Sequence, residues 1–377
     1  MSIPNDEDNN SVSRRAVIGG AMAAAVPAMG LARTVAAASG SRMVKSMTVY
    51  APGGMDNLRV SQVEVRPPSA GEITVRLRAS SINYHDYLMV RSRAKPQPLI
   101  PLSDGAGEVV EVGAGVANFK RGDNVISMFY PTWEDDRDIP EGFKTVPGDG
   151  IDGFAREMVT MPANAFTLAP KNLSHREAAT LSCAGVTAWR ALMTDGGLKS
   201  GDTVLTLGTG GVSVFAVQFA KMMGAKVIST TSSDEKAVRL KALGASEVIN
   251  YRATPDWGQA VRDLTNGVGV DHIIETGGKD TWPQSIIAAR NYGHIAYIGV
   301  VAGGHAEVPG GPILVKRLRI IGVAVANRQD QIAMVKTIEQ KGNLKPVLDK
   351  DFALEQLGDA FRYEESGAHF GKITISI

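Results

Sequence analysis

The spacing of hydrophobic and polar positions changes character along the chain. Residues 45–130 alternate short apolar runs with Gly, Pro and Asp, as in MTVYAPGG, EITVRLRASSIN and GEVVEVGAGVANFKRGDNVISMF. This spacing predicts short strands with frequent turns, and hence a β-rich, barrel-like domain. The charged, Pro- and Gly-rich stretch at 131–152 is longer than a hairpin needs. We expect it to be a loop near a site or an interface.

From Gly201 onward the pattern predicts strands and helices in alternation. The strands are DTVLTLG, KVISTT, SEVIN, VDHIIET and HIAYIGV, and the helices between them include VSVFAVQFAKMMGA, DEKAVRLKALGA and a segment near 256–265. Ser232 and Glu235 are expected to form a capping box for the second helix. Regular alternation predicts a doubly wound parallel sheet with right-handed crossovers. The tail, 312–377, leaves this alternation and ends in the β-type run GKITISI, so we expect it to return to the first domain.

The N-terminal segment differs from both of these regions. Arg14 and Arg15 precede a Gly- and Ala-rich apolar run at 16–32, and Ala36–Ala38 follows. The run is shorter than the roughly 20 apolar residues that span a bilayer, so no membrane anchor is expected. The order of these features resembles a twin-arginine signal, which exports folded proteins. We expect cleavage after Ala38 and a periplasmic location, with a cytoplasmic protein carrying a disordered leader as the alternative.

Charge and cysteine content narrow the classes of function. Without residues 1–38 the chain has 37 basic and 36 acidic residues, and no basic stripe is present to bind nucleic acid. About 339 residues are more than one core usually organises, which indicates two domains. The only cysteine is Cys183, so an intramolecular disulfide and a Cys-rich zinc lobe are excluded.

A dinucleotide-binding turn is predicted in VLTLGTGGVSVFAVQFA. Gly208 would allow the tight turn after the strand, and the amides of Gly210 and Gly211 would approach a pyrophosphate at the helix N-terminus. Val212 and Ser213 follow in the first helical turn, with Ser213 in the place of the third glycine of the motif. The motif indicates dinucleotide binding because a predicted strand precedes it and a predicted helix follows it.

The end of the second strand indicates which cofactor is bound. A site for NAD has an acidic residue there, but this chain has Thr231, Ser232 and Ser233, with Lys236 beyond them. Hydroxyl groups and a cation suit a 2′-phosphate, and Tyr251 could add a further contact. We therefore expect NADP(H) rather than NAD(H), although the aspartate directly after the serines keeps NAD(H) open as the alternative.

Several segments together resemble one family. VVEVGAGVANFKRGDNV, EAATLSCAGVTAW, LGTGGVSVFAVQFAK, SSDEKAVRLKALGASEVINYR and GVDHIIETGG are similar to medium-chain dehydrogenase/reductases, which include zinc alcohol dehydrogenases and zinc-free quinone reductases. The resemblance covers nearly all of residues 45–377. It implies an α/β chain with a GroES-like β-barrel catalytic domain, an inserted Rossmann sheet and an active site between them. The expected divisions are a signal peptide (1–38), the catalytic domain (39–170), the NADP-binding domain (171–311) and a return to the catalytic domain (312–377).

The resemblance also identifies the positions at which zinc members hold their catalytic metal. These positions are Asn83, Ser103 and Cys183, so one of three ligands is retained. Zn²⁺ needs a set of His, Cys or carboxylate ligands, and we therefore expect no metal. The nearby His85 and Asp104 leave a rearranged metal site as the alternative. Without a Lewis acid a simple ketone is harder to polarise, whereas a quinone or conjugated carbonyl carries its own electron sink.

The residues implied for catalysis lie in the same two segments. Tyr84 would donate a hydrogen bond to the substrate, and His85 would act as general acid. Ser103 and Asp104 would line the site. The alternatives are core packing for Tyr84, a solvent-facing or structural role for His85, and a buried, inert thiol for Cys183.

Further cofactor contacts and the overall function follow from the resemblance. Six more residues are expected at the cofactor: Asn83, Thr187, Gly277, Gly299, Val300 and Lys372. A surface lysine is the alternative for Lys372. The leading prediction is a zinc-free NADPH-dependent oxidoreductase acting on a small quinone or conjugated carbonyl, with a homodimer implied by the family. The alternatives are a zinc-independent alcohol or ketone dehydrogenase and an NADP(H)-binding sensor without turnover.

Overall fold

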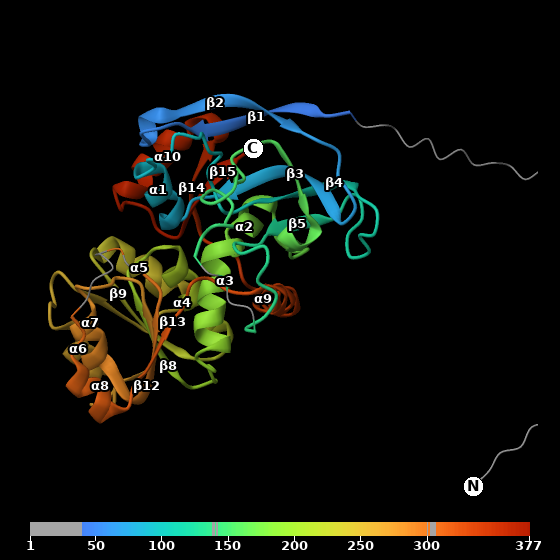
Figure 1. The fold of residues 1–377 in the computed structure, drawn as a ribbon. Coiled ribbons are helices and arrows are strands. Elements are labelled where there is room, and N and C mark those ends of the chain that lie inside the picture. The colour runs from blue at the N-terminus through green and yellow to red at the C-terminus, as the bar shows by residue number, and fades with distance from the viewer. Residues whose placement is uncertain (1–39, 138–139, 141, 300, 302–306) are drawn as a thin grey trace, which may run out of the picture. The chain divides into compact units, whose positions relative to one another are not determined.

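The computed structural model describes residues 40–137, 140, 142–299, 301 and 307–377. Gly40–Ile377 form one compact unit (Figure 1). The predicted signal peptide and Val300 lie outside the described residues. No described helix is both long and apolar enough to cross a bilayer.

A six-stranded parallel sheet forms the second half of the chain. Its order is β10-β9-β8-β11-β12-β13, with every neighbouring pair parallel. This confirms the predicted doubly wound sheet, and places β8 and β11 at the point where the strand order reverses. The strands are β8 (Thr203–Leu207), β9 (Lys226–Thr231), β10 (Glu247–Asn250), β11 (Val270–Glu275), β12 (Ala289–Tyr297) and β13 (Arg319–Gly322). Their helices are α4 (Gly211–Met222), α5 (Asp234–Leu243), α6 (Trp257–Leu264), α7 (Trp282–Ala288) and α8 (Gly310–Lys316).

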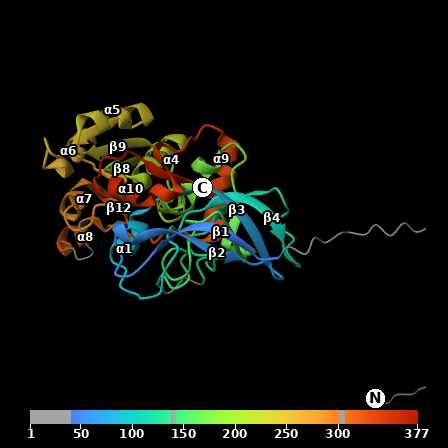
Figure 2. The same cartoon turned by 90° about the horizontal axis from the view of Figure 1, so that it is seen from above.

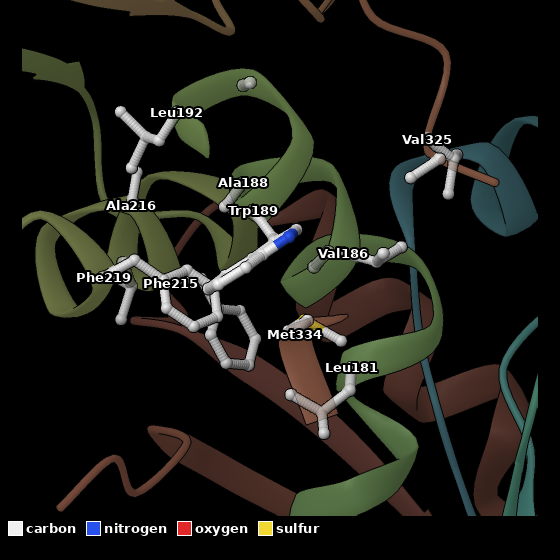
Figure 3. Close-up of a cluster of buried hydrophobic side chains, with 14 of the residues drawn as sticks. Leu181, Val186, Ala188, Trp189, Leu192, Phe215, Ala216, Phe219, Val325 and Met334 are labelled. Carbon is white, nitrogen blue, oxygen red and sulfur yellow. The ribbon is translucent and has the colours of Figure 1, made fainter. Parts of the chain in front are cut away.

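Both faces of this sheet are covered, which explains its continuous apolar strands. On β8, Val204 belongs to the same buried cluster as Phe215 and Phe219 of α4. Figure 3 shows these two phenylalanines close to Trp189. Leu205 belongs to a second cluster, with Trp257 of α6 and Trp282 of α7. Burying each of these large side chains contributes about 1.5–3 kcal/mol to folding.

Two details differ from the sequence expectations. The N-cap of α5 is Ser233 rather than Ser232, since Ser233 Oγ accepts a hydrogen bond from Lys236 N at 3.2 Å. Adjacent serines are equally good caps, so the sequence alone could not choose between them. The parallel sheet also continues to Gly322 through β13, beyond the boundary predicted at 311.

A second, mostly antiparallel sheet is built from both ends of the described chain. Its path is β14-β15-β3-β4-β5-β7, with β6 on β3, and a hairpin of β1 and β2 lies apart from it. Figure 2 shows this hairpin on the side of the molecule away from α5 and α6. The tail strand β15 pairs with β3, so the tail completes the first domain as predicted. The strands are β1 (Arg42–Val49), β2 (Leu58–Val65), β3 (Glu72–Ser81), β4 (Ala106–Val112), β5 (Asn124–Ser127), β6 (Met158–Pro162), β7 (Phe166–Leu168), β14 (Leu348–Ala353) and β15 (Lys372–Ser376).

The helices outside the parallel sheet bring the candidate site residues together. They are α1 (Tyr84–Arg91), α2 (His175–Ala179), α3 (Val186–Trp189), α9 (Arg328–Lys341) and α10 (Leu357–Glu365). Two π-helical turns, Leu181–Gly185 and Arg190–Thr194, flank α3. Such turns recur at functional sites, and the first of them contains Cys183.

Candidate functional site

The predicted dinucleotide turn connects β8 to α4 at the edge where such sheets bind ligands. Gly208 has a φ of 74°, which turns the chain tightly after the strand. Gly210 is the N-cap of α4, and no described side chain caps this helix. A Cβ added to Gly210 would meet no described atom within 4 Å. The first-turn N–H groups of α4 therefore suit an anion such as a pyrophosphate.

The other two residues of the turn pack inward. Ser213 Oγ donates to Leu207 O at 2.6 Å, so the serine in the place of the third glycine ties α4 to β8. Val212 is half-buried next to it. A Cβ on Gly211 would lie 2.6 Å from Cδ of Lys372 and 3.2 Å from Cβ of Ala184. Gly211 therefore has no room for a side chain where the tail packs against the turn.

The residues predicted to choose the cofactor cluster at the end of β9. Thr231 is buried, Ser232 is half-buried and Ser233 caps α5, whereas Tyr251 is exposed. Lys236 Nζ donates to the backbone oxygens of Gly367 (2.8 Å) and His369 (3.0 Å). Burial lowers the pKa of Lys236. Lys236 therefore lies beside the position predicted for the 2′-phosphate, and its amine donates hydrogen bonds to backbone oxygens of the tail.

The ends of β11 and β12 carry Gly277 and Gly299 at the same edge of the sheet. Gly277 N donates to Glu275 Oε1 at 2.9 Å, and Gly299 N donates to Glu275 O at 3.1 Å. The buried Glu275 carboxylate also accepts from Gly278 N, Thr281 Oγ1 and Ser285 Oγ. Sequence reasoning missed this brace, because a single glutamate at the end of a strand carries no local signature.

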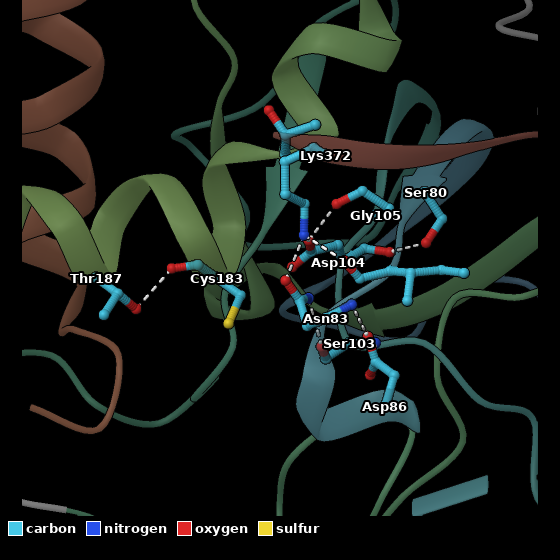
Figure 4. A network of polar contacts seen from close by, with 12 residues as sticks. Ser80, Asn83, Asp86, Ser103, Asp104, Gly105, Cys183, Thr187 and Lys372 are labelled. Carbon is cyan, nitrogen blue, oxygen red and sulfur yellow. Dashed lines mark hydrogen bonds and ion pairs between the residues drawn. The ribbon is translucent and has the colours of Figure 1, made fainter. Parts of the chain in front are cut away.

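A buried group of polar side chains lies where α1, β15 and the segment before β4 meet (Figure 4). We call it the polar cluster, and its members are Asn83, Asp86, Ser103, Asp104 and Lys372. Asp86 fixes two of the others, because its Oδ2 accepts from Asn83 N at 3.0 Å and its Oδ1 from Ser103 N at 2.9 Å. Burial raises the pKa of Asp86.

Lys372 is the cation of the polar cluster. Its side chain is 4% exposed, so the alternative of a surface lysine is wrong. Its Nζ donates to Ile82 O and, at 2.5 Å, to Asn83 Oδ1, and lies 3.7 Å from Asp104 Oδ2. The contact with a cofactor phosphate stays a prediction that these observed contacts do not favour.

Asp104 is fully buried, and only one of its carboxylate oxygens has a hydrogen-bond partner among the described residues. Ser81 Oγ donates to Oδ2 at 2.5 Å, whereas Oδ1 accepts from no described group. Burial raises the pKa of Asp104 to about 6, against the opposing effect of Lys372. Asp104 therefore faces the lysine as its counter-charge within the polar cluster.

The first residues of α1 lie at the border of the polar cluster. Tyr84 is 37% exposed, so the core-packing alternative is wrong. His85 packs its ring against Phe129 and Phe143, with centroids 5.4 and 4.8 Å away. Its Nε2 lies 3.4 Å from Asp149 Oδ2 and makes no hydrogen bond to a described group. The imidazole is thus positioned by aromatic packing, with its buried Nε2 beside the Asp149 carboxylate.

One thiol, that of Cys183, and one carboxyl group, that of Glu364, complete the surroundings of the polar cluster. Burial and the nearby Asp104 raise the pKa of Cys183, which keeps the thiol protonated. Thr187 Oγ1 donates to Cys183 O at 2.7 Å, so Thr187 closes the π-helical turn. Glu364 of α10 was not predicted as a site residue from the sequence, because a Glu-Glu pair in a charged helix is typical of a solvent-exposed helix face. Its Oε2 is buried without a described hydrogen-bond partner, and burial raises its pKa to about 8.

The three positions of the family's metal ligands do not fit a zinc ion. Asn83 uses its Oδ1 to accept from Lys372 and its Nδ2 to donate to Ser103 Oγ at 3.2 Å. Of the three positions only Cys183 keeps a side chain that ligates zinc, and the ammonium of Lys372 against Asn83 repels a dication. The described residues contain no group of three His, Cys, Asp or Glu side chains that could hold a metal.

Comparisons with known proteins agree with this architecture. Residues 211–340 match the family described as zinc-binding dehydrogenase, and residues 69–171 match the alcohol dehydrogenase GroES-like domain. A zinc-type alcohol dehydrogenase-like protein of Schizosaccharomyces pombe is 41% identical over 336 residues, covering 86% of this chain and 96% of the relative. A chloroplastic quinone oxidoreductase of Triphysaria versicolor is 29% identical, covering 86% of this chain and 95% of its own.

Solved structures give the same result. The crystal structure of a putative alcohol dehydrogenase from Sinorhizobium meliloti is 38% identical, with a TM-score of 0.80, and covers 90% of this chain and 99% of its own. The fold, the dinucleotide turn and these similarities lead to one conclusion. The chain belongs to the medium-chain dehydrogenase/reductase superfamily and is an NAD(P)-dependent oxidoreductase.

Proposed function

We propose that this enzyme reduces a small quinone or conjugated carbonyl with NADPH and without zinc. The observation that carries the proposal is the chain of hydrogen bonds from Lys372 through Asn83 to Ser103, at the positions where zinc members bind their metal. These residues supply a cation and a hydroxyl but no metal ligand set. An acceptor with its own conjugated electron sink needs less polarisation than a simple ketone.

The preference for NADPH is supported by the end of β9. Ser232, Ser233 and Lys236 offer hydroxyls and a cation to a 2′-phosphate. The neighbouring acid, Asp234, accepts a hydrogen bond from Asn250 Nδ2 at 2.8 Å. One of its carboxylate oxygens is therefore bound within the protein rather than free for a ribose hydroxyl. An acid at this position is what an NAD site requires.

The remaining residues have separate roles in the proposed reaction. When bound, the cofactor supplies a hydride to the acceptor. The turn at Gly208–Gly211 holds the pyrophosphate, and Gly277 and Gly299 approach the ribose and carboxamide. Tyr84 donates a hydrogen bond to the acceptor oxygen as it gains negative charge, and Ser103 lines the site. His85 passes one solvent proton to that oxygen, which balances the hydride and completes the reduction.

An alcohol or ketone dehydrogenase is the second candidate. It is favoured by the name of the S. pombe relative, zinc-type alcohol dehydrogenase-like protein. A quinone reductase is favoured by the name of the T. versicolor relative. Both reactions would use the same cofactor turn. The residues of the polar cluster, which contact the acceptor side of the site, would therefore determine which of the two reactions takes place.

A panel of acceptors tests the proposal. Purified enzyme is mixed with NADPH or NADH and a quinone, an enone, an aldehyde or a ketone, and cofactor oxidation is followed by absorbance. We expect turnover with quinones or enones, faster with NADPH. Turnover confined to aldehydes, ketones and the corresponding alcohols would favour the second candidate.

We also propose that the enzyme is exported through the twin-arginine route and acts in the periplasm. The support is the sequence of residues 1–38 alone. Fractionation of cells expressing the full chain tests this, with Arg14→Lys/Arg15→Lys as the export-deficient control. Equal amounts of both proteins in the periplasm, or none of either, would refute the proposed route.

A further inference from the structure

We propose that Glu275 is a positioning residue for the nicotinamide half of the cofactor, because it fixes both strand ends that are expected to face that half. Under the proposed function Gly277 and Gly299 approach the ribose and the carboxamide, and this inference rests on that position. The choice of acceptor does not affect it, since the same cofactor contacts serve a quinone, an enone or a ketone.

Glu275 is the last residue of β11, in the middle of the parallel sheet. The neighbours of β11 are β8 on one side and β12 on the other, and Glu275 itself pairs with Tyr297 of β12. The strand order reverses between β8 and β11, and dinucleotides bind at such a reversal, outside the carboxyl ends of the strands. The residues that follow Glu275 therefore leave the sheet where the cofactor is expected.

The side chain of Glu275 holds the loop between β11 and α7. Its Oε1 accepts hydrogen bonds from Gly277 N (2.9 Å), Gly278 N (3.1 Å) and Thr281 Oγ1 (2.6 Å). Its Oε2 accepts from Ser285 Oγ of α7 at 2.5 Å. Glu275 is fully buried, so these donors replace the water that the side chain would bind outside the protein. A loop folded around one buried oxygen has little freedom to move.

The backbone carbonyl of Glu275 holds the end of β12. Its oxygen accepts from Ile298 N at 2.9 Å and from Gly299 N at 3.1 Å. A Cβ on Gly299 would lie 1.9 Å from Thr276 O, so only a glycine allows the two strand ends to pack this closely. One residue thus fixes the segments that contain both Gly277 and Gly299.

The direction of these hydrogen bonds determines what the edge of the sheet offers to a ligand. The backbone N–H groups of Gly277, Gly278, Ile298 and Gly299 all donate to Glu275. The carbonyl oxygens of Gly277 and Ile298 accept from no described group. The edge therefore offers acceptors, which match the hydroxyl groups of a ribose and the amide N–H groups of a carboxamide.

The residue after Glu275 connects this part of the site to the phosphate turn. Thr276 Oγ1 donates to Leu207 O at 3.0 Å, and Ser213 Oγ donates to the same oxygen at 2.6 Å. Leu207 is the last residue of β8, directly before the turn. The ends of β8, β11 and β12 are therefore joined, and a shift at Glu275 would move the nicotinamide contacts relative to the pyrophosphate.

Two substitutions separate the reach of the side chain from its charge. Glu275→Gln keeps an oxygen for the donors at Oε1, and its amide can donate to Ser285 Oγ, so we expect nearly wild-type behaviour. Glu275→Asp keeps the charge but is one methylene shorter, so the loop must shift to reach it. We expect kcat to fall about 100-fold in Glu275→Asp, because small misplacements of reacting groups have effects of this size.

Binding of half of the cofactor shows where the shift occurs. Adenosine 2′,5′-bisphosphate carries the adenine, its ribose and the 2′-phosphate but no nicotinamide riboside. In Glu275→Asp we expect the Kd of NADPH to rise about tenfold and the Kd of the bisphosphate to stay within about twofold.

Three results would overturn the inference. Equal weakening of both ligands in Glu275→Asp would indicate a general loss of structure. An unaffected Glu275→Asp would show that the reach of the side chain is unimportant. A Glu275→Gln variant impaired as strongly as Glu275→Asp, or more strongly, would assign the effect to the charge.

Should Glu275→Asp fail to fold, Thr281→Val takes its place, because it removes one donor to Oε1 and keeps the shape of the side chain. We expect the Kd of NADPH to rise about threefold, with an unchanged Kd of the bisphosphate. An unchanged Kd of NADPH in this variant would also overturn the inference.

Asp271→Ala is the control on the same strand. Asp271 lies near the other end of β11, where its carboxylate accepts from Thr203 N (2.8 Å) and Arg290 Nε (2.5 Å). We expect a lower Tm with wild-type kcat and Kd values. All variants are assayed with the acceptor that the wild type reduces best. A wild type that binds NADH rather than NADPH would refute the proposed cofactor, and the comparison is then made with NADH and adenosine monophosphate.

Discussion

The side-chain oxygen of Asn83 lies 2.5 Å from the amine of Lys372. The two residues are 289 positions apart, one at the start of α1 and the other at the start of β15. They meet because β15 pairs with β3, the strand that leads into α1. The return of the tail to the first domain therefore places a buried cation against Asn83, a position that the family resemblance assigns to a metal ligand.

Substitutions at two adjacent glycines should distinguish an effect on cofactor binding from an effect on folding. A Cβ on Gly210 would point into open space, where the pyrophosphate is expected, whereas a Cβ on Gly211 would press on Lys372 and Ala184. Gly210→Ala should weaken NADPH binding about tenfold or more with an unchanged Tm. Gly211→Ala should lower the Tm. Titration of NADPH fluorescence and thermal unfolding measure both effects, and an unaltered NADPH affinity in Gly210→Ala would contradict the proposed position of the pyrophosphate.

Tyr84 and His85 should contribute differently to the rate. Tyr84→Phe removes a neutral hydrogen-bond donor, so we expect kcat to fall about tenfold at every pH. His85→Asn removes the proton carrier, so we expect a loss of about 10²-fold together with a flatter pH profile of kcat. Profiles of equal shape for His85→Asn and the wild type would show that His85 carries no proton in the rate-limiting step.

Acid should destabilise the fold through a histidine pair in the parallel sheet. His272 Nδ1 lies 3.4 Å from His294 Nδ1, and burial lowers both pKa values, that of His294 to about 3. Asp202, Asp271 and Arg319 also face the pair. Unfolding restores ordinary values near 6.5, so the unfolded chain binds more protons between pH 6.5 and 3.

The free energy of unfolding should therefore fall as the pH is lowered through this range. A pKa that differs by one between the folded and the unfolded chain corresponds to about 1.4 kcal/mol. Urea unfolding at a series of pH values measures the dependence, and His294→Gln should reduce its slope. An identical slope in the wild type and His294→Gln would show that another group is responsible.

The edge of the parallel sheet should form a homodimer interface. β13 has no strand on its outer side among the described residues. Leu314 and Val315 of α8, the helix that precedes β13 in the chain, are 78% and 80% exposed. Exposed apolar side chains next to an open edge indicate a contact between copies. Light scattering should give a dimer for the wild type and a monomer for Leu314→Glu, and a monomeric wild type would refute this assembly.

The periodic parts of the fold could be predicted from the sequence. The strands and helices of the parallel sheet have long apolar patterns, and the turn at Gly208–Gly211 has a motif with a defined position after β8. The N-cap at Ser233 and the edge strand β13 were not predicted correctly, because neighbouring serines cap equally well and a short exposed strand lacks a pattern.

The contacts of the polar cluster could not be predicted in the same way. The resemblance identified Asn83, Ser103 and Asp104 as site residues, but the partner of Lys372 depends on the pairing of β15 with β3. Glu364 and Glu275 were missed for a related reason. Each is an ordinary acid in its local sequence, and only tertiary packing buries it.

The dependence of turnover on zinc tests the central claim most directly. The purified enzyme is treated with a chelator, dialysed, analysed for metal and assayed with NADPH and a quinone or enone, before and after zinc is added. We predict substoichiometric zinc, full activity after chelation and no gain when zinc is restored. Loss of activity on chelation that added zinc reverses would contradict the account.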